Sequence, residues 1–294
     1  MITAPVQRTR TILATLLALL AFAANSLLCR MALSPGTGGS EPAATSAIDA
    51  ASFTSVRLIC GALTLLLLVI LRERRLPTGG GWGSSALLFL YASTFSFAYL
   101  KLPTGTGALL LFGAVQLTML CAALRSGERP RRAEWSGLFL CAGGLVWLVL
   151  PGISTPPLGS TALMLIAGIA WGIYSLRGRV ATRPLHETTG NFLRSIPLTL
   201  VFSLLFFSQG QLSPTGLLLA ALSGALASGV GYAVWYVALG GLTAARAALI
   251  QLAVPVLAAC GGVLVLAEDV TPRLVVASAL ILGGIGLAVH RKEQ

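Results

Sequence analysis

Long apolar stretches, separated by a few polar or helix-breaking residues, occupy most of the chain. A helix needs about 20 mostly apolar residues to cross the hydrocarbon core of a bilayer. Ten stretches have about this length, and the pattern therefore predicts an all-α polytopic membrane protein with ten transmembrane helices. The stretches span residues 12–33, 53–71, 84–101, 104–125, 134–151, 160–178, 190–208, 214–238, 242–266 and 272–290.

Two of the joins between stretches are very short. Pro103 and Gly105 separate the third stretch from the fourth, and Gly240 and Gly241 separate the eighth from the ninth. Because proline and glycine interrupt helices, each join is predicted to connect two helices.

The composition agrees with a membrane protein. Hydrophobic residue types make up 56% of the chain and charged types only 10%, whereas a soluble domain carries about 25% charged residues. The net charge of +11 would suit nucleic acid in a soluble protein. Here the positive charges lie in short segments between apolar stretches, which is the pattern of membrane orientation, and no nucleic-acid binding is expected.

Lysine and arginine mark the segments that face the cytoplasm. If the N-terminus is cytoplasmic, the external segments hold only Lys101 and Arg273, and the C-terminus is also cytoplasmic. The internal segments hold Arg8, Arg10, Arg72, Arg74, Arg75, Arg125, Arg129, Arg131, Arg132, Arg177, Arg179, Arg183, Arg291 and Lys292.

The first stretch has a second interpretation. Arg8 and Arg10 precede an apolar run that reaches Ala21-Phe22-Ala23, as in a signal peptide with its cleavage site. The apolar run continues to Leu33, and an internal repeat uses this stretch, which favours a retained helix.

Similar residues recur in the two halves of the chain at a nearly constant distance. Arg57 and Arg194 are 137 residues apart, as are Phe95 and Tyr232. The same kind of match relates Gly143-Gly144 to Gly283-Gly284, Glu128 to Glu268, and Ser26 and Arg30 to Ser175 and Arg179. We predict two five-helix repeats, residues 1–151 and 152–294. Because five is odd, the second repeat is inverted, which is typical of transporters that alternate access to a central site.

Each half resembles the five-helix module of the drug/metabolite transporter superfamily, the EamA-type carriers. The second half carries the fuller set of matching residues, in Val254-Pro255-Val256, Ala267-Glu268, Gly283-Gly284 and Trp171-Gly172. The first half departs from the module at Phe22-Ala23, where Trp-Gly is usual, and at Val115, where the proline is missing.

The resemblance implies a secondary transporter in a bacterial inner membrane. Within the superfamily the chain looks most like exporters of amino acids, including aromatic ones, and the expected partners are a small-molecule substrate and the lipid bilayer. A flippase for lipids or lipid-linked sugars and a drug efflux carrier share this architecture and stay as alternatives. A monomer is expected.

Polar and aromatic side chains inside an apolar bundle are candidates for the substrate path. The resemblance implies that the first, third, fourth, sixth, eighth and ninth helices surround the cavity, and these side chains fall on that set. The candidates are Asn25, Ser26, Tyr91, Phe95, Tyr99, Gln116, Trp171, Tyr174, Tyr232, Trp235, Tyr236, Arg246 and Gln251.

Other roles are open for several candidates. Tyr99 and Tyr236 could belong to interfacial aromatic belts, and Asn25 and Ser26 could bridge helices by hydrogen bonds. Arg30, Arg57, Arg194 and Arg246 lie near predicted helix ends, where their side chains are expected to reach the headgroups. Arg246 has a second possible role, in binding a substrate carboxylate.

All nine acidic residues fall in predicted loops or at helix ends. Proton-coupled carriers commonly keep a carboxylate in mid-membrane, so facilitated transport is expected. His186 and His290 are far apart, and no Cys-x-x-Cys occurs. No catalytic residue, metal site or cofactor is therefore predicted, and the chain is not expected to be an enzyme.

Overall fold

The computed structural model describes residues 4–33, 48–125, 132–150, 155–179, 181–206, 211–239, 250–251 and 253–289. Within these ranges the chain is almost entirely helical and forms no strand. The helices are α1 (Ala4–Leu33), α2 (Ala50–Glu73), α3 (Trp82–Tyr99), α4 (Thr104–Arg125), α5 (Arg132–Val149), α6 (Leu158–Arg179), α7 (Pro184–Leu205), α8 (Pro214–Leu222), the π-helical segment η2 (Ser223–Val230), α9 (Gly231–Leu239), α11 (Ala253–Leu266) and α12 (Pro272–Val289).

The helices follow the predicted stretches in number and order. The segments α8, η2 and α9 run without a break as one rod, so the described residues form ten rods. Four rods are long and apolar enough to span a membrane by length and composition, and the described parts of α4, α5, α11 and α12 include shorter apolar helices. The predicted glycine join at 240–241 and the first part of the stretch 242–266 lie outside the described residues.

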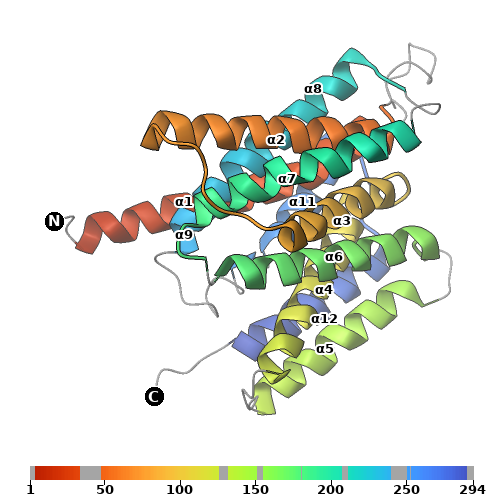
Figure 1. Cartoon of the computed structure of the whole chain (residues 1–294). Helices are drawn as coiled ribbons and strands as arrows, with labels where there is room; N and C mark the ends of the chain where they lie inside the picture. The colour runs from red at the N-terminus through yellow and green to blue at the C-terminus, as the bar shows by residue number, and fades with distance from the viewer. Residues whose placement is uncertain are drawn as a thin grey trace.

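The rods pack in a bundle in which α1 begins and α12 ends at the same end (Figure 1). Helix α5 packs on α12, α4 on α11, and α2 on α7. The contacts of α3 with α6 correspond to those of α1 with α9, and the contacts of α4 with α6 to those of α1 with α11. These contacts correspond when the first five rods are exchanged with the second five, and the two repeats stay a prediction. The boundary at residues 151 and 152 stays a prediction.

Glycines allow the closest helix contacts. In α5 and α12, a Cβ at Gly144 would meet Ile281, and one at Gly284 would meet Gly137 and Leu140. These are the glycine pairs that match between the halves, and each lets its helix approach the backbone or short side chains of the other.

Helix α2 approaches η2 equally closely. A Cβ at Gly224 would collide with the backbone of Arg57, and a Cβ at Gly61 would meet Phe192 and the carbonyl oxygen of Gly224. The π-helical turns of η2 lie at this contact in the middle of the rod. Such turns interrupt a helix and often occur at functional sites.

The connection between α2 and α3 is held against the first turns of α7. The Gly80 N–H donates to Glu187 Oε2 at 2.7 Å, and the Gly81 N–H donates to Asn191 Oδ1 at 2.9 Å. Arg194 Nη1 donates to the carbonyl oxygen of Gly79 at 2.7 Å. Arg194 therefore stabilises a helix connection, contrary to the expectation that it reaches toward headgroups.

The close contact at Gly224 leads to a test of the fold. Substituting Gly224→Val should separate α2 from η2, because the new side chain meets backbone that cannot rotate away. We expect a loss of about 1–3 kcal/mol in unfolding free energy, as for other overpacked sites. Reversible unfolding of the purified protein in mixed micelles measures it. Gly143→Ala is the control, because a Cβ there meets nothing within 4 Å; equal stability of the two variants would contradict the packing.

Candidate functional site

A small closed cavity lies where helices of both halves meet. Its volume is about 20 Å³, which is room for about one water molecule and too little for an amino acid. The residues that line it are Phe22, Asn25, Ser26, Tyr91, Phe95, Leu111, Phe112, Trp171 and Tyr232. Six of the predicted substrate-path residues are thus brought together: Asn25, Ser26, Tyr91, Phe95, Trp171 and Tyr232.

Aromatic rings from the two halves close this cavity. The centroid of Trp171 lies 5.0 Å from that of Tyr91 and 4.9 Å from that of Tyr232. Phe22 meets Tyr232 edge-on at 6.0 Å and Trp235 edge-on at 5.7 Å. Such ring pairs stabilise their contact beyond simple area burial. The rings fill the space that a solute would occupy, so the cavity as described is in a closed state.

A polar network runs behind the aromatic wall. The hydroxyl of Ser223 donates to Asn25 Oδ1 at 2.6 Å, and Asn25 Nδ2 donates to the Tyr91 hydroxyl at 3.3 Å. Arg57 Nη2 donates to the same hydroxyl at 3.1 Å, and Arg57 Nε donates to Ser228 Oγ at 3.1 Å. The network joins α1, α2 and α3 of the first half to η2 of the second.

The structure corrects the expectation for Arg57. This side chain is 1% exposed, and its guanidinium carbon lies 5.1 Å from the ring centroid of Tyr91 and 4.9 Å from that of Phe95. It therefore does not reach the headgroups. Its place is set by the close approach of α2 to η2, which no local sequence pattern reveals.

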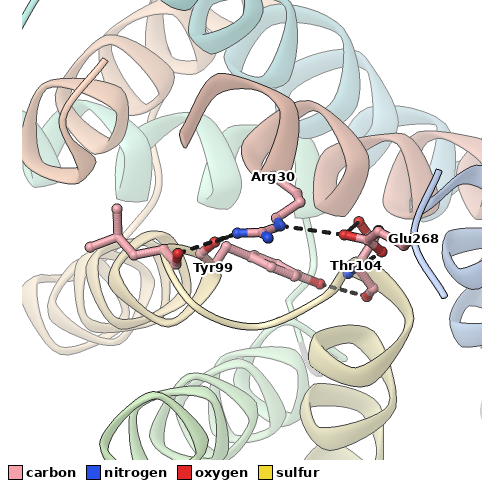
Figure 2. Close-up of polar contacts among 5 residues, drawn as sticks. Arg30, Tyr99, Thr104 and Glu268 are labelled. Atoms are coloured by element: carbon pink, nitrogen blue, oxygen red, sulfur yellow. Dashed lines mark hydrogen bonds and ion pairs between the residues drawn. The ribbon is translucent and has the colours of Figure 1, made fainter. Parts of the chain in front are cut away.

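A second polar cluster lies where α1 ends (Figure 2). Arg30 Nε pairs with Glu268 Oε1 at 3.3 Å, and Arg30 Nη1 donates to the carbonyl oxygen of Tyr99 at 2.9 Å. The Thr104 N–H donates to Glu268 Oε2 at 2.7 Å. Glu268 thus accepts at the first residue of α4, where the helix dipole favours an anion. Arg30 is engaged between helices, again contrary to the headgroup expectation.

We call Arg30, Tyr99, Thr104 and Glu268 the end cluster. It connects α1, the α3–α4 turn and the segment between α11 and α12, which are distant in sequence. The residues Arg30 and Glu268 come from different predicted repeats, so the cluster fastens the halves together at one end of the bundle.

An apolar hollow lies at the other end of α1. It has a volume of about 670 Å³ and is bounded by residues 9–17 of α1 and by Val234 and Val237 of α9. Along α1 the order is therefore the hollow, the closed cavity at residues 22–26, and the end cluster at Arg30.

Three other predicted path residues lie next to the cavity without lining it. Tyr174 stacks on Trp171 at 5.5 Å and accepts from Asn191 Nδ2 at 3.4 Å. Tyr99 is fully buried beneath Phe95, and its hydroxyl donates to the carbonyl oxygen of Thr104. Trp235 is buried beside Phe22.

Four predicted residues are less closely tied to the cavity. The Tyr236 hydroxyl lies beside Gly178 of α6. Gln116 is half-buried on α4, and Gln251 is buried. Arg246 lies outside the described residues, so its two possible roles stay predictions.

Sequence reasoning missed several residues of this region: Phe22, Arg57, Leu111, Phe112 and Ser223. Phe22 had been noted only as a departure from a motif, although it lies at the centre of the ring cluster. Ser223 had a usable signal, because it is a polar residue in a stretch predicted to line the path. Leu111 and Phe112 are ordinary membrane residues by sequence.

Comparisons with known proteins agree with this architecture. The sequence profile of the EamA-like transporter family matches residues 159–289. An uncharacterised protein of Pseudomonas aeruginosa is 53% identical over 279 residues, 95% of this chain and 94% of that protein. The threonine/homoserine exporter RhtA of Escherichia coli is 30% identical over 288 residues, 91% of this chain and 92% of that exporter.

A solved crystal structure has the same fold, with a TM-score of 0.66 and 21% identity over 96% of this chain and 97% of that one. The chain belongs to the EamA-like transporter family, within the drug/metabolite transporter superfamily. It is therefore a membrane-embedded transporter.

The two tyrosines of the cavity wall should respond differently to loss of their hydroxyls. Tyr91→Phe removes the partner of both Asn25 and Arg57, and we expect a loss of about 1–3 kcal/mol in unfolding free energy. Tyr232→Phe should be neutral or stabilising, because the buried Tyr232 hydroxyl has no hydrogen-bond partner in the part of the chain that the structure describes. Thermal unfolding of both variants in one detergent measures the difference, and a larger loss for Tyr232→Phe would refute the network.

Proposed function

We propose that the protein is a secondary transporter that exports small amphipathic metabolites, most of all amino acids, by alternating access. The observation that carries the proposal is the closed cavity, whose wall combines aromatic rings from both halves of the chain with Asn25 and Ser26 of α1. Rings suit an apolar side chain or an ammonium group, and amides and hydroxyls suit the polar ends of an amino acid.

The similarity to a threonine/homoserine exporter over nearly the full length of both chains supports the same class of substrate. Threonine and homoserine carry a hydroxyl on a short side chain, and the cavity wall offers hydroxyl and amide partners. The aromatic wall also favours larger amino acids, so both groups belong in the test.

The proposed cycle opens the cavity at one end of the bundle and then at the other. The end cluster closes the end that the arginine distribution assigns to the outside. The apolar hollow lies toward the opposite, cytoplasmic end, and the rings of Phe22, Trp171 and Tyr232 separate it from the cluster. Breaking the Arg30–Glu268 pair and parting the rings would open a path outward. We place the protein in a bacterial inner membrane with both termini cytoplasmic.

No described carboxylate lies among the cavity residues; the acids whose side chains are described lie at helix ends or in connections. Nothing near the cavity therefore offers a carboxylate proton relay, which supports transport driven by the substrate gradient.

Because the end cluster holds the outer end closed in this proposal, Glu268→Gln should increase the population of the outward-open state. The neutral amide loses the ion pair with Arg30 and weakens the contact with Thr104. A shift of ~1.4 kcal/mol toward the outward-open state changes its population about tenfold. The readout is labelling of Ser26→Cys by a membrane-impermeant maleimide in whole cells, with the five native cysteines replaced.

Asp269→Asn is the matched control for this test, because Asp269 is an exposed acid beside Glu268. We expect Glu268→Gln to label about tenfold faster than the control. Equal labelling rates in the two variants would show that the cluster does not hold the outer end closed.

Counterflow in proteoliposomes tests the substrate class. We expect saturable exchange of radiolabelled threonine, homoserine or an aromatic amino acid, with the same rate in the presence and absence of a pH gradient. Trp171→Ala and Tyr232→Ala should reduce exchange at least tenfold, because each removes a cavity wall ring of substantial binding area.

The outcome also separates the alternatives. If folded protein exchanges no amino acid, the amino-acid assignment fails. Movement of fluorescent lipid between leaflets would then favour a flippase, and efflux of a hydrophobic dye would favour a drug carrier. A rate that follows the pH gradient would contradict gradient-driven exchange.

A further inference from the structure

We propose that Arg57 forms the binding site for the carboxylate of the transported solute. The inference rests on the proposed function and makes it more specific: the solute would be a zwitterion whose anionic end meets a fixed guanidinium on α2. None of the comparisons assigns a role to this residue.

Arg57 carries a positive charge that the described part of the chain does not balance. Its contacts are two hydroxyls, those of Tyr91 and Ser228, and the faces of two rings, those of Tyr91 and Phe95. Among the described residues it forms no ion pair. A buried charge is costly unless it is paired and hydrogen-bonded. An anion bound beside Arg57 would therefore offset the cost of burying its charge.

One nitrogen of the Arg57 guanidinium lacks a hydrogen-bond acceptor in the described part of the chain. Among the described residues, the buried Nη1 of Arg57 has no hydrogen-bond partner, although Nε and Nη2 are both engaged. Unpartnered buried polar groups are rare in folded proteins and call for an explanation, such as a ligand that supplies the partner. A guanidinium presents its donors in a planar fork that matches the two oxygens of a carboxylate.

The guanidinium does not line the cavity itself but lies directly behind two rings of its wall. Tyr91 and Phe95, whose rings it contacts, are both lining residues. A second buried donor without a partner among the described residues, the Tyr232 hydroxyl, belongs to the wall of the same cavity. When the rings part to admit a solute, Nη1 and the Tyr232 hydroxyl would become accessible as free donors, and an acceptor such as a carboxylate would satisfy them.

The repeat counterpart of Arg57 is engaged with the protein backbone. Arg194 lies 137 residues later and donates to the carbonyl oxygens of Gly79 and Gly190. Arg30, another described arginine within a predicted span, pairs with Glu268. Arg57 differs from both, because one buried nitrogen of its guanidinium has no partner among the described residues.

The rest of the wall suits the other end of a zwitterion. The faces of Trp171 and Tyr232 can hold an ammonium group by cation–π attraction. A ligand with a carboxylate at Arg57 and an ammonium near these rings would place its side chain against Leu111 and Phe112. Size and polarity of the side chain would then set specificity.

The test compares Arg57→Met and Arg57→Lys with wild type, with Arg72→Gln as the control. Arg72 is exposed on the last turn of the same helix. Methionine keeps much of the volume without the charge, and replacing a buried charge by an apolar residue is often tolerated by the fold. Stability of each variant is measured first, so that a folding defect is recognised separately.

Binding is then measured as ligand-induced thermal stabilisation in detergent, and transport as counterflow. The probes are L-homoserine, L-threonine and L-phenylalanine, the neutral amide of each, and 3-phenylpropionate as a carboxylate without an amino group. Wild type should prefer each acid over its amide at least tenfold. Arg57→Met should raise the half-saturating concentration of the acids roughly 30-fold and abolish the preference, since it removes a charge-assisted contact.

Arg57→Lys should keep part of the preference, because it retains the charge without the planar fork. If folded Arg57→Met keeps the wild-type preference for acids over amides, the carboxylate site is overturned, whatever the transport data show. If wild type ignores amino acids but binds 3-phenylpropionate in an Arg57-dependent way, the site stands and the amino-acid function falls. If wild type binds none of the probes, both proposals fail.

Discussion

The hydrocarbon interior of a bilayer offers no hydrogen-bond partner, and this constraint shapes the whole bundle. The helical backbone satisfies its own donors and acceptors, and serine and threonine hydroxyls can donate to their own helix, but a buried amide or guanidinium needs partners on other helices. Asn25 therefore meets Tyr91 and Ser223, and Arg57 meets Tyr91 and Ser228. Ser223 and Ser228 lie in the second half of the chain, so their bonds join the two halves. Among the described residues, one nitrogen of Arg57 and the hydroxyl of Tyr232 have no partner, and they lie behind and in the cavity wall, where a solute could supply one.

Helix α1 organises this arrangement along its length. Its first turns border the apolar hollow, its middle carries Phe22, Asn25 and Ser26 into the cavity, and Arg30 near its end joins the end cluster. Helix η2 provides the opposite surface, because its glycine lets α2 approach until the Arg57 side chain reaches Ser228. Closure at the cluster and closure by the rings are separate sets of contacts, so one can open while the other stays shut. That independence is what an alternating-access transporter requires.

The number and order of the helices could be predicted from the sequence, because a membrane-spanning helix needs only sufficient length and low polarity. The aromatic stripe of Tyr91 and Phe95 was readable for a similar reason: residues four apart share a helix face. Contacts between distant segments were not. Glu268 and Arg30 are 238 residues apart, and Arg57 looks like any arginine near a helix end until α2 is packed on η2. The central position of Phe22 is visible only from the three rings that surround it. The extent of closure depends on how side chains from five helices fill one cavity.

The central claim, that the halves separate at the end cluster during transport, can be measured as a distance. Spin labels at Lys101 and Asp269 would sit on the exposed α3–α4 turn and on the segment after α11, on either side of the cluster. Pulsed electron paramagnetic resonance of the protein in lipid nanodiscs should show two populations, a short distance that matches the closed arrangement and a longer one whose share changes with transported amino acid. A single distance that stays the same with every ligand, in protein that transports, would contradict the account.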